Sequence, residues 1–419
     1  MKSLLRLASN SLLNRKATVL LSIFTIAISV LLLLGVEQVR TQAKNSFANT
    51  ISGTDLIVGA RSGQINLLLY SVFRIGNATN NIDWKTYQEF KEHKSVNWTV
   101  PFSLGDSHQG FRVLGTNQDY FKHYKFGKKQ PLSFVQGKPF DQLFEAVIGA
   151  DVAHTLGYQL QSPMVLAHGM KDIGFSQHDN APFRVVGILA PTGTPVDKTI
   201  HVSLEAIEAI HVGWESGAFL GHAPSADKLQ QRAFEPKQIT AFLMGLNSKI
   251  HTFHVQREVN DYRLEPLSAI VPGIALHELW SLMSVAEQAL LVVSIFVVVA
   301  GFLGMLASLL TSLNERRREM AILRALGAKP RHIFSLLVLE TGIICGLGIL
   351  LGMGLLYLIL ALAGPIIQQN YGLAINLTTP SQYELMLIGC IQLSGLIIGI
   401  IPAISAYRQS LSDGMTIRI

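Results

Sequence analysis

The chain has 419 residues, of which 49% are hydrophobic and 15% are charged, and its mean hydropathy is +0.34. This balance fits a protein that is part membrane-embedded and part globular. The formal net charge of +6 comes from short segments that flank apolar runs. We therefore expect no nucleic-acid partner, because the placement of the basic residues beside the apolar runs already accounts for the charge.

Four apolar runs are long enough to cross a bilayer, which takes about 18 or more apolar residues. They are Ala17–Val36, Ala289–Leu310, Ile333–Leu362 and Leu385–Ala406. A long and mostly polar stretch separates the first run from the other three. This spacing predicts an α-helical membrane protein with four transmembrane helices and one large extramembrane domain inserted between the first two.

The distribution of charge predicts how the chain crosses the membrane. Residues 1–16, 313–332 and 407–419 together carry twelve basic and three acidic residues, a net charge of +9. Residues 37–288 carry 22 basic and 23 acidic residues, a net charge of −1. Basic residues concentrate in the cytoplasmic loops of membrane proteins. We therefore expect both termini and the 313–332 loop in the cytoplasm, and the large domain and the 363–384 loop outside.

The helices that flank the large domain are expected to extend beyond the membrane as a stalk. No proline falls between Pro272 and Pro330, and a helix over 274–313 would be about 60 Å long, twice the roughly 30 Å hydrocarbon core. The alternative is two helices joined by a short loop near Gln288. The first apolar run is too long for a signal-peptide core and is followed by no convincing cleavage site, so we interpret it as an uncleaved anchor.

The extramembrane domain shows the mixed pattern of an α/β fold. Apolar runs bounded by turn residues predict strands over Asp55–Val58, Phe111–Leu114, Ala146–Ala153, Phe183–Ala190 and Ile239–Leu246. Helices are expected over Trp84–His93, Val202–His211 and Ser248–Tyr262, the first and last with Asp83 and Ser248 as N-caps. Both cysteines, Cys345 and Cys390, lie in apolar runs, so this domain is expected to fold without disulfides.

The predicted organisation divides the chain into nine segments. They are a cytoplasmic segment 1–16, a first span and stalk 17–51, an outer domain 52–272, a stalk and second span 273–312, a cytoplasmic segment 313–332, a third span 333–362, an outer loop 363–384, a fourth span 385–406 and a cytoplasmic tail 407–419. Within the outer domain we place one subdomain at about 50–120 and 237–272 and a second, inserted subdomain at about 121–236.

The cytoplasmic segment between the second and third spans predicts a short amphipathic helix. Gly327 is a natural C-terminal cap, and Pro330 stops continuation. The polar face presents Glu315, Arg316, Arg318 and Glu319, and the apolar face presents Met320, Leu323 and Leu326. Such a helix docks on a partner protein or lies on the membrane surface, attracted by anionic lipid. The physical chemistry of these residues leaves both interpretations open.

The same segment resembles the coupling region of the FtsX/MacB-type ABC transporter permeases. Its sequence from Glu315 is Glu-Arg-Arg-Arg-Glu-Met-Ala-Ile-Leu-Arg-Ala-Leu-Gly-Ala. Residues Val147–Ala153 and Phe183–Leu189 are similar to parts of that family's periplasmic core, and the order of spans matches as well. The resemblance implies an α/β periplasmic domain with porter and sabre-like subdomains. It also implies two paired permease protomers and a cytoplasmic ATPase whose motion is transmitted to the outer domain.

The resemblance also implies a role for the coupling segment, which is to contact the ATPase. The residues assigned to that contact are Glu315, Arg316, Arg318, Glu319, Met320, Leu323, Arg324, Leu326 and Gly327. No Gly-x-x-x-x-Gly-Lys-Ser/Thr phosphate loop occurs in the sequence, and residues 1–16 are too short for an ATPase domain. We therefore expect a non-catalytic subunit without a cofactor of its own, with ATP and Mg²⁺ bound by a separate ATPase polypeptide.

Three weaker features have competing explanations. Glu340 lies within the third span, where it pairs with an arginine near the cytoplasmic face or serves a proton relay. His251 and His254 are spaced to face one metal ion, but no further ligand stands near them in sequence, which favours surface histidines. The small-residue pairs at 342 and 346, 348 and 352, and 395 and 399 favour close packing of spans within or between protomers.

The function that these expectations favour is mechanical transmission across a bacterial inner membrane. The outer domain would act on a periplasmic adaptor or cargo, for export or extraction of a lipoprotein, lipid, peptide or small toxic molecule. A second reading is a regulator that uses the same motion to activate a periplasmic enzyme such as a cell-wall hydrolase. A third is a sensor that passes a ligand signal inward.

Overall fold

The computed structural model describes residues 15–168, 181–212, 226–315, 317–325, 327–371 and 377–408. It separates into two units. The first, here called the helical unit, comprises Met1–Gln42, Ser284–Ile366 and Ile375–Ile419. The second, here called the α/β unit, comprises Ala43–Met283 and Ile367–Ala374.

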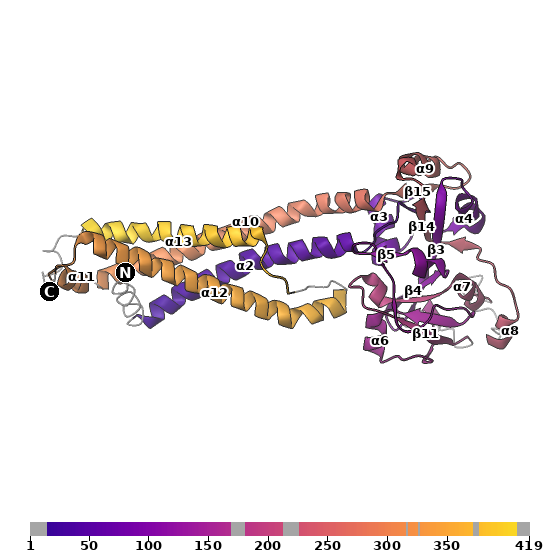
Figure 1. The fold of residues 1–419 in the computed structure, drawn as a ribbon, viewed down its shortest axis with the longest axis horizontal. Helices are drawn as coiled ribbons and strands as arrows, with labels where there is room; N and C mark the ends of the chain where they lie inside the picture. Colours follow the sequence, from indigo (N-terminus) through magenta and orange to yellow (C-terminus); the bar gives the residue numbers. More distant parts are fainter. Residues whose placement is uncertain are drawn as a thin grey trace. The chain divides into compact units, whose positions relative to one another are not determined.

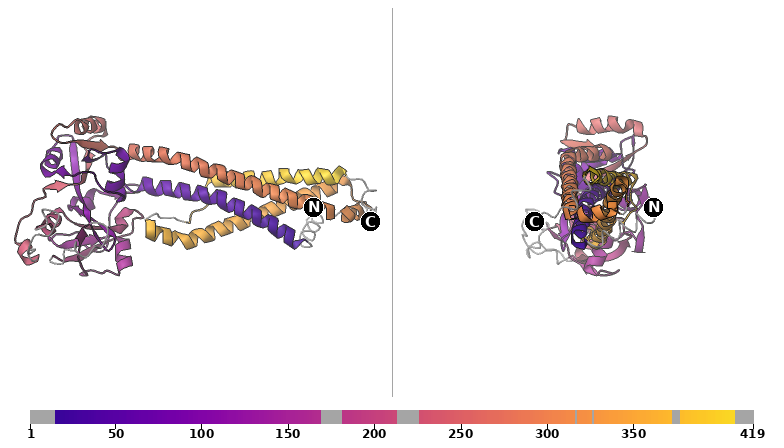
Figure 2. Two further views of the ribbon diagram at one scale, coloured as in Figure 1. Left: turned by 180° about the vertical axis from the view of Figure 1, so that it is seen from behind. Right: turned by 90° about the vertical axis from the view of Figure 1, so that its left-hand side faces the viewer.

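Four long helices supply the membrane-spanning part of the chain (Figures 1 and 2). They are α2 (Lys16–Asn49), α10 (Pro272–Glu315), α12 (Pro330–Tyr371) and α13 (Gln382–Arg408). By length and composition, all four are able to cross a membrane. The prediction of four transmembrane helices, with a large domain between the first two, is therefore confirmed.

Close contacts between small residues hold the helices of the helical unit together. A Cβ added at Gly348 of α12 would lie 2.7 Å from Cβ of Ile26 in α2, and one at Gly352 would lie 2.6 Å from the carbonyl oxygen of Ala27. Likewise, a Cβ at Gly399 of α13 would lie 2.7 Å from Thr341 of α12. Glycine lets helix backbones approach each other closely in a membrane. These small-residue faces therefore pack within the chain.

Helix α10 is unbroken from Pro272 to Glu315, so the alternative of two helices joined near Gln288 is wrong. The boundaries between the two units, after Gln42 and before Ser284, fall within α2 and α10. With 34 and 44 residues, these helices are about 51 Å and about 66 Å long at about 1.5 Å per residue. Each is therefore longer than the roughly 30 Å hydrocarbon core.

The α/β unit is built on an eleven-stranded mixed sheet within the described residues. Nine strands follow the order β15-β1-β14-β3-β4-β12-β8-β11-β7, while β10 pairs with β3 and β9 with β11. The strands are β1 (Leu56–Ala60), β3 (Val96–His108), β4 (Phe111–Thr116), β7 (Phe134–Gly137), β8 (Glu145–Ile148), β9 (Pro163–Met164), β10 (Ala167–His168), β11 (Phe183–Leu189), β12 (Thr199–Ser203), β14 (Ala241–Leu246) and β15 (Leu267–Ile270).

Two short ribbons and a set of short helices complete this unit. The ribbons pair β2 (Ile82–Asp83) with β13 (Gln238–Ile239) and β5 (Lys125–Phe126) with β6 (Gln130–Pro131). The α-helices are α3 (Gln64–Leu68), α4 (Trp84–Lys91), α5 (Asp119–His123), α6 (Ala150–Leu156), α7 (Leu204–Ile210), α8 (Ala226–Gln230) and α9 (Thr252–Asn260). A π-helical turn η1 (Leu69–Phe73) follows α3, and the 3-10 turns are η2 (Pro195–Lys198) and η3 (Lys249–His251).

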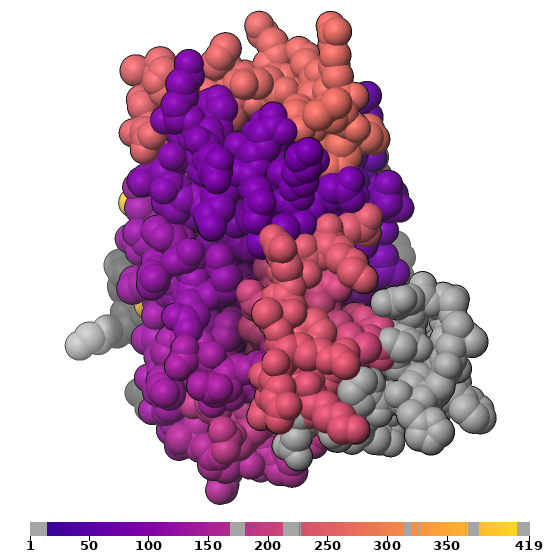
Figure 3. Space-filling model, turned by 90° about the vertical axis from the view of Figure 1, so that its right-hand side faces the viewer, coloured from indigo at the N-terminus to yellow at the C-terminus, as the bar shows by residue number. Residues whose placement is uncertain are grey.

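Strand pairing brings distant segments of the sequence together. Strand β12 pairs in parallel with β4, with Ile200 opposite Val113, and antiparallel with β8. Strand β3 pairs with β14, and the face in Figure 3 accordingly shows early residues (indigo and purple) beside residues from 226 onward (pink). Strands from both predicted subdomains thus share one sheet through β4 and β12. The subdomain boundaries themselves stay a prediction.

The local predictions were correct for several elements and wrong for two. The expected strand Ala146–Ala153 ends at Ile148, and helix α6 begins at Ala150. Gly149 makes the turn where a Cβ would meet the carbonyl oxygen of Asp197 at 2.3 Å. The expected helix from Val202 begins only at Leu204, because the residues before it belong to β12.

The two predicted N-caps also differ in outcome. Ser248 accepts a hydrogen bond from the backbone N–H of Ile250, 3.4 Å away, and so caps η3. Asp83 precedes α4 as expected, but its carboxylate makes no capping hydrogen bond. It accepts one from the Gln238 side chain, at 3.2 Å, and so links β2 to β13.

Candidate functional site

The predicted coupling segment forms the short helix α11 (Arg317–Ala325) between α10 and α12 (Figure 1). Gly327 ends it with a φ of +97°, a left-handed conformation that glycine adopts without strain, and its N–H donates to the carbonyl oxygen of Arg324 at 3.0 Å. Pro330 then begins α12, where a missing backbone N–H costs nothing. The Gly-to-Pro interval thus sets a sharp reversal of the chain.

Helix α11 packs against three of the spanning helices through its apolar face. Met320 is 8% exposed. It belongs to a cluster that draws residues from α10, α12 and α13, namely Leu313, Ile333, Leu337, Ala403 and Ala406. Ala321 is buried as well. Burial of a methionine side chain is worth about 1.5–3 kcal/mol, so these contacts fix α11 against the helical unit.

Arg324 adds a polar attachment of α11 to the end of α13. Its Nη2 donates to the carbonyl oxygens of Tyr407 at 3.0 Å and Ala406 at 3.4 Å. The last carbonyls of a helix have no partner within that helix, and they carry its negative dipole end. The Arg324 guanidinium donates hydrogen bonds to these carbonyls, and its positive charge lies at the negative end of the helix dipole. Helix α11 is therefore tied to α10 by the chain and to α12 and α13 by side chains.

The structure places only some of the predicted coupling residues. The side chains of Glu315, Arg316, Arg318, Glu319, Leu323 and Leu326 lie outside the described part of the structure. Met320 packs against α10, α12 and α13 of its own chain, so the apolar face of α11 is covered by the helical unit. Ile322, which was not singled out, is 53% exposed. Assignment of the nine residues to an ATPase contact stays a prediction.

Glu340 pairs with an arginine, which was the first of its two explanations, the other being a proton relay. Arg15 Nη2 lies 3.3 Å from Glu340 Oε2, and the glutamate side chain is 1% exposed. An ionised carboxylate within a membrane needs such a partner because its solvation is lost there. Arg15 lies just before α2, so the ion pair ties the start of α2 to the first part of α12. Sequence alone did not single out this arginine.

Ion pairs of Arg40, which the sequence did not predict, link α2 to α10 within the helical unit. Arg40 Nη2 lies 2.8 Å from Glu37 Oε1, and Arg40 Nη1 lies 3.5 Å from Glu287 Oε2. Glu37 is 8% exposed. The available signal was the presence of acidic and basic residues just beyond two apolar runs.

The two histidines considered as metal ligands are both exposed. His251 ends η3 and His254 lies in α9. In the described ranges, no group of three or more His, Cys, Asp or Glu residues is arranged to hold a metal ion.

Comparison with protein families matches two models to the chain. The MacB-like periplasmic core domain matches residues 19–242, more than half of the chain. The FtsX-like permease C-terminal domain matches residues 291–411. Together they include α2, much of the α/β unit, and the helices from α10 to α13.

Several relatives share these regions. A macrolide export ATP-binding/permease protein MacB 1 of Yersinia pestis bv. Antiqua is 24% identical over 330 residues, which is 77% of this chain and 46% of that protein. The MacB of Wolinella succinogenes is 23% identical over 242 residues, 55% of this chain and 33% of that protein. The chain thus spans less than half the length of these relatives.

A solved structure of the periplasmic region of MacB from Actinobacillus actinomycetemcomitans aligns with 55% of this chain and 94% of its own, at 9% identity and a TM-score of 0.32. The family assignment rests on the two family models. The chain therefore belongs to the family of FtsX-like permeases that carry a MacB-like periplasmic core domain.

Proposed function

We propose that this chain is the permease subunit of an ABC transporter that converts the motion of a separate cytoplasmic ATPase into movement of the α/β unit. In this proposal two permease protomers pair in a bacterial inner membrane, with both termini in the cytoplasm and the α/β unit in the periplasm. ATP and Mg²⁺ are bound by the ATPase. The chain itself carries out no catalysis.

The continuity of α2 and α10 is the observation that carries the proposal. Each helix contributes residues to both units without a break in its hydrogen-bonded backbone. In the helical unit, Arg40 binds carboxylates from both helices. In the α/β unit, Phe47 of α2 and Trp280 of α10 contact each other with ring centroids 5.7 Å apart. A continuous helix with contacts in each unit offers a path for displacement.

The attachments of α11 supply the input to this transmission. Met320 and Arg324 hold α11 against the ends of α12 and α13, and the chain joins it to α10. Force applied to α11 by a partner therefore reaches three helices at once. A helix that only lies on the membrane surface transmits no force and needs no such attachments, so they favour the coupling role.

The output of the motion is proposed as export or extraction of a lipoprotein, lipid, peptide or small toxic molecule. A periplasmic adaptor or cargo protein would then contact the α/β unit. Activation of a periplasmic enzyme, such as a cell-wall hydrolase, uses the same motion without transport. The third reading, a ligand sensor, reverses the direction of the signal.

Two variants separate capture of the ATPase from transmission of its motion. Glu319→Lys reverses a charge predicted to meet the ATPase and is expected to reduce recovery of the ATPase with the tagged permease. Val285→Pro breaks α10 outside the predicted span at a position 72% exposed. It is expected to leave recovery of the ATPase intact. Val285→Ala is the matched control, because it removes the same side chain without breaking the helix.

The readout of transmission is the distance between the two α/β units of a complex. A spin label at Lys128, which is exposed, reports this distance by pulsed electron resonance in a Cys390→Ser background. We expect an ATP-dependent distance change in the native sequence and in Val285→Ala but not in Val285→Pro. An unchanged response in Val285→Pro, or equal ATPase recovery with Glu319→Lys, would contradict the proposal.

A further inference from the structure

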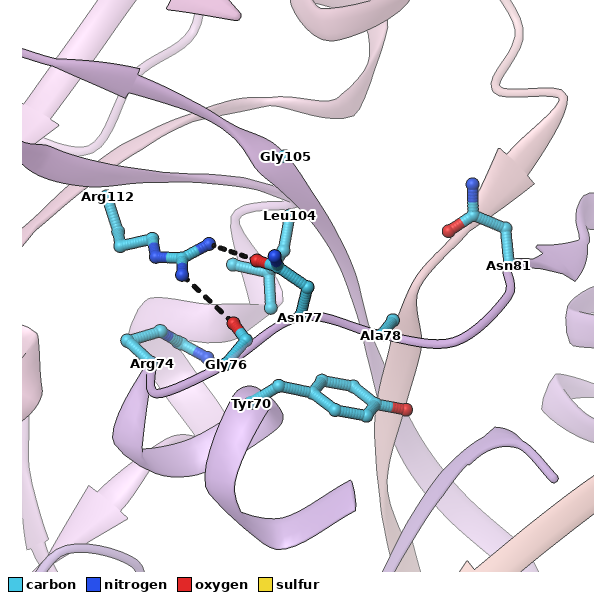
Figure 4. Close-up of a pocket in the computed structure, with 9 residues that line it drawn as sticks. All are labelled: Tyr70, Arg74, Gly76, Asn77, Ala78, Asn81, Leu104, Gly105 and Arg112. Carbon is cyan, nitrogen blue, oxygen red and sulfur yellow. Dashed lines mark hydrogen bonds between the residues drawn. The ribbon is translucent and has the colours of Figure 1, made fainter. Parts of the chain in front are cut away.

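A cavity in the α/β unit is lined by two arginines, neither of which pairs with a carboxylate of the described residues. It has a volume of about 360 Å³ and lies where the loop after η1 meets β3 and β4. Its lining residues are Tyr70, Arg74, Gly76, Asn77, Ala78, Asn81, Leu104, Gly105 and Arg112 (Figure 4). No carboxylate occurs among them.

Arg112 reaches the cavity from β4 and holds its rim. Its Nη1 donates to Oδ1 of Asn77 at 3.0 Å, and its Nη2 donates to the carbonyl oxygen of Gly76 at 2.9 Å (Figure 4). Its Nε is buried and has no hydrogen-bond partner within the described residues. The two Nη contacts hold the loop after η1 against β4.

Arg74 reaches the cavity from the end of η1. It adopts a left-handed backbone conformation with a φ of +60°, its Nη1 donates to the carbonyl oxygen of Ser71, and its guanidinium lies 5.0 Å from the centre of the Phe102 ring. Its Nε is likewise buried without a partner among the described residues. A non-glycine residue at such a φ is uncommon and marks a position held by its surroundings.

The two guanidiniums act on each other electrostatically. Burial lowers the pKa of Arg112, and the positive charge of Arg74 lowers it further. In the part of the chain that the structure describes, neither arginine forms an ion pair with a carboxylate. Placing two like charges together without a counter-charge costs free energy, which an anion between them would recover.

We propose that this cavity binds a small oxyanion, the carboxylate or phosphate group of a solute or of the end of a larger molecule. The guanidinium fork matches such groups in geometry and charge. The Asn77 amide supplies a further donor, and Tyr70 and Leu104 supply an apolar wall. The volume is near the lower end of the roughly 300–1,000 Å³ range of ligand sites, which suits a small anion or an end group. This inference does not rest on the proposed ATPase coupling.

Gly105 offers a way to close the cavity without touching either arginine. A Cβ added there would have no atom within 4 Å, and its backbone is not in the left-handed region. Gly105→Leu is therefore expected to fold and to fill the cavity. Gly63 is the matched control, because it has the same open surroundings, is exposed, and does not line the cavity.

The test measures anion binding to the purified full chain by calorimetry in a low-chloride buffer. The probes are inorganic phosphate, succinate and glycerol 3-phosphate. We expect binding of at least one probe at one site per chain, weakened by about tenfold or more in Gly105→Leu and in Arg112→Gln, because charge-assisted hydrogen bonds are lost. Gly63→Leu and Arg257→Gln, which changes an exposed arginine on α9, should bind as the native sequence does.

A further variant keeps the test valid if Arg112→Gln fails to fold. Arg74→Asn removes the second charge at a φ that asparagine tolerates, and it should also weaken binding. Tighter binding of glycerol 3-phosphate than of phosphate would support an organic phosphate such as a lipid headgroup as the source. Equal binding would support a free anion, and preference for succinate a carboxylate. Absence of binding by all three probes, or binding unchanged by the cavity variants, would overturn the proposal.

Discussion

Replacement of Gly348 by alanine tests whether the small-residue face of α12 holds α2 in place. The added Cβ would lie 2.7 Å from both Cβ and Cγ2 of Ile26 and 3.1 Å from the carbonyl oxygen of Ile23. Ile26 is 1% exposed. The obstructing atoms belong to the stem of a branched side chain and to backbone, so they cannot rotate away. The helices α2 and α12 must therefore move apart.

Gly354 provides a control in the same helix for the same substitution. A Cβ added at Gly354 would have no atom within 4 Å. The change from glycine to alanine favours helix by about 0.8–1 kcal/mol at either position. Overpacking of a close contact costs about 1–3 kcal/mol. Because the propensity gain cancels between the two variants, Gly348→Ala should be less stable than Gly354→Ala by about 1–3 kcal/mol.

Reversible unfolding in mixed micelles of a mild detergent and dodecyl sulfate measures this difference in the free energy of unfolding. The native sequence is expected to lie between the two variants or close to Gly348→Ala. Equal stabilities for Gly348→Ala and Gly354→Ala would refute the close packing of α2 on α12. Greater stability of Gly348→Ala would refute it more strongly.

Two further predictions concern buried titratable groups. Arg15→Ala removes the guanidinium 3.3 Å from the buried carboxylate of Glu340 and should cost about 3–5 kcal/mol. The double variant with Glu340→Gln should recover much of this, and a double variant no more stable than Arg15→Ala would contradict the pairing. Burial, assisted by the charge of Arg74, lowers the pKa of His201 from its ordinary 6.5 to about 3. Below pH 6.5 the unfolded chain therefore binds more protons than the folded chain, and the free energy of unfolding decreases as the pH is lowered. Between about pH 7.5 and about pH 5 this loss should be about 2 kcal/mol, and His201→Phe should lack it; equal pH dependence in both proteins would exclude the effect.

The spans were predictable from sequence because their signal is local. A run of apolar residues long enough for a bilayer needs no information about neighbours. The residues from Ala146 to Ala153 show where such reasoning ends. Their apolar run favours a strand, yet Gly149 packs on the backbone at Asp197, and that contact sets the change from β8 to α6. The contact joins positions far apart in the sequence, so no local pattern contains it.

The candidate site was predictable in outline for the same reason. The spacing of Met320 in α11 identifies an apolar face, but spacing does not identify which surface covers it, and here residues of α12 and α13 do so. Pairing of Glu340 with an arginine was one of two explanations offered, and which arginine it is depended on the packing of α2 beside α12. The cavity arginines, Arg74 and Arg112, belong to no motif. Sheet pairing and the fold of η1 bring them together.

The two proposals meet in the turn η1. Arg74, which lines the anion cavity, follows directly on Phe73, whose ring centroid lies 4.6 Å from that of Phe47 in α2. If the ATPase displaces α2, the contact between Phe47 and Phe73 carries the displacement to Arg74, the next residue, which lines the cavity. Coupling between two sites is reciprocal: an anion that binds one position of α2 more tightly must favour that position. Occupancy of the cavity should then change the affinity of the complex for ATP, and Gly105→Leu should abolish that change without altering the affinity for ATP in the absence of anion.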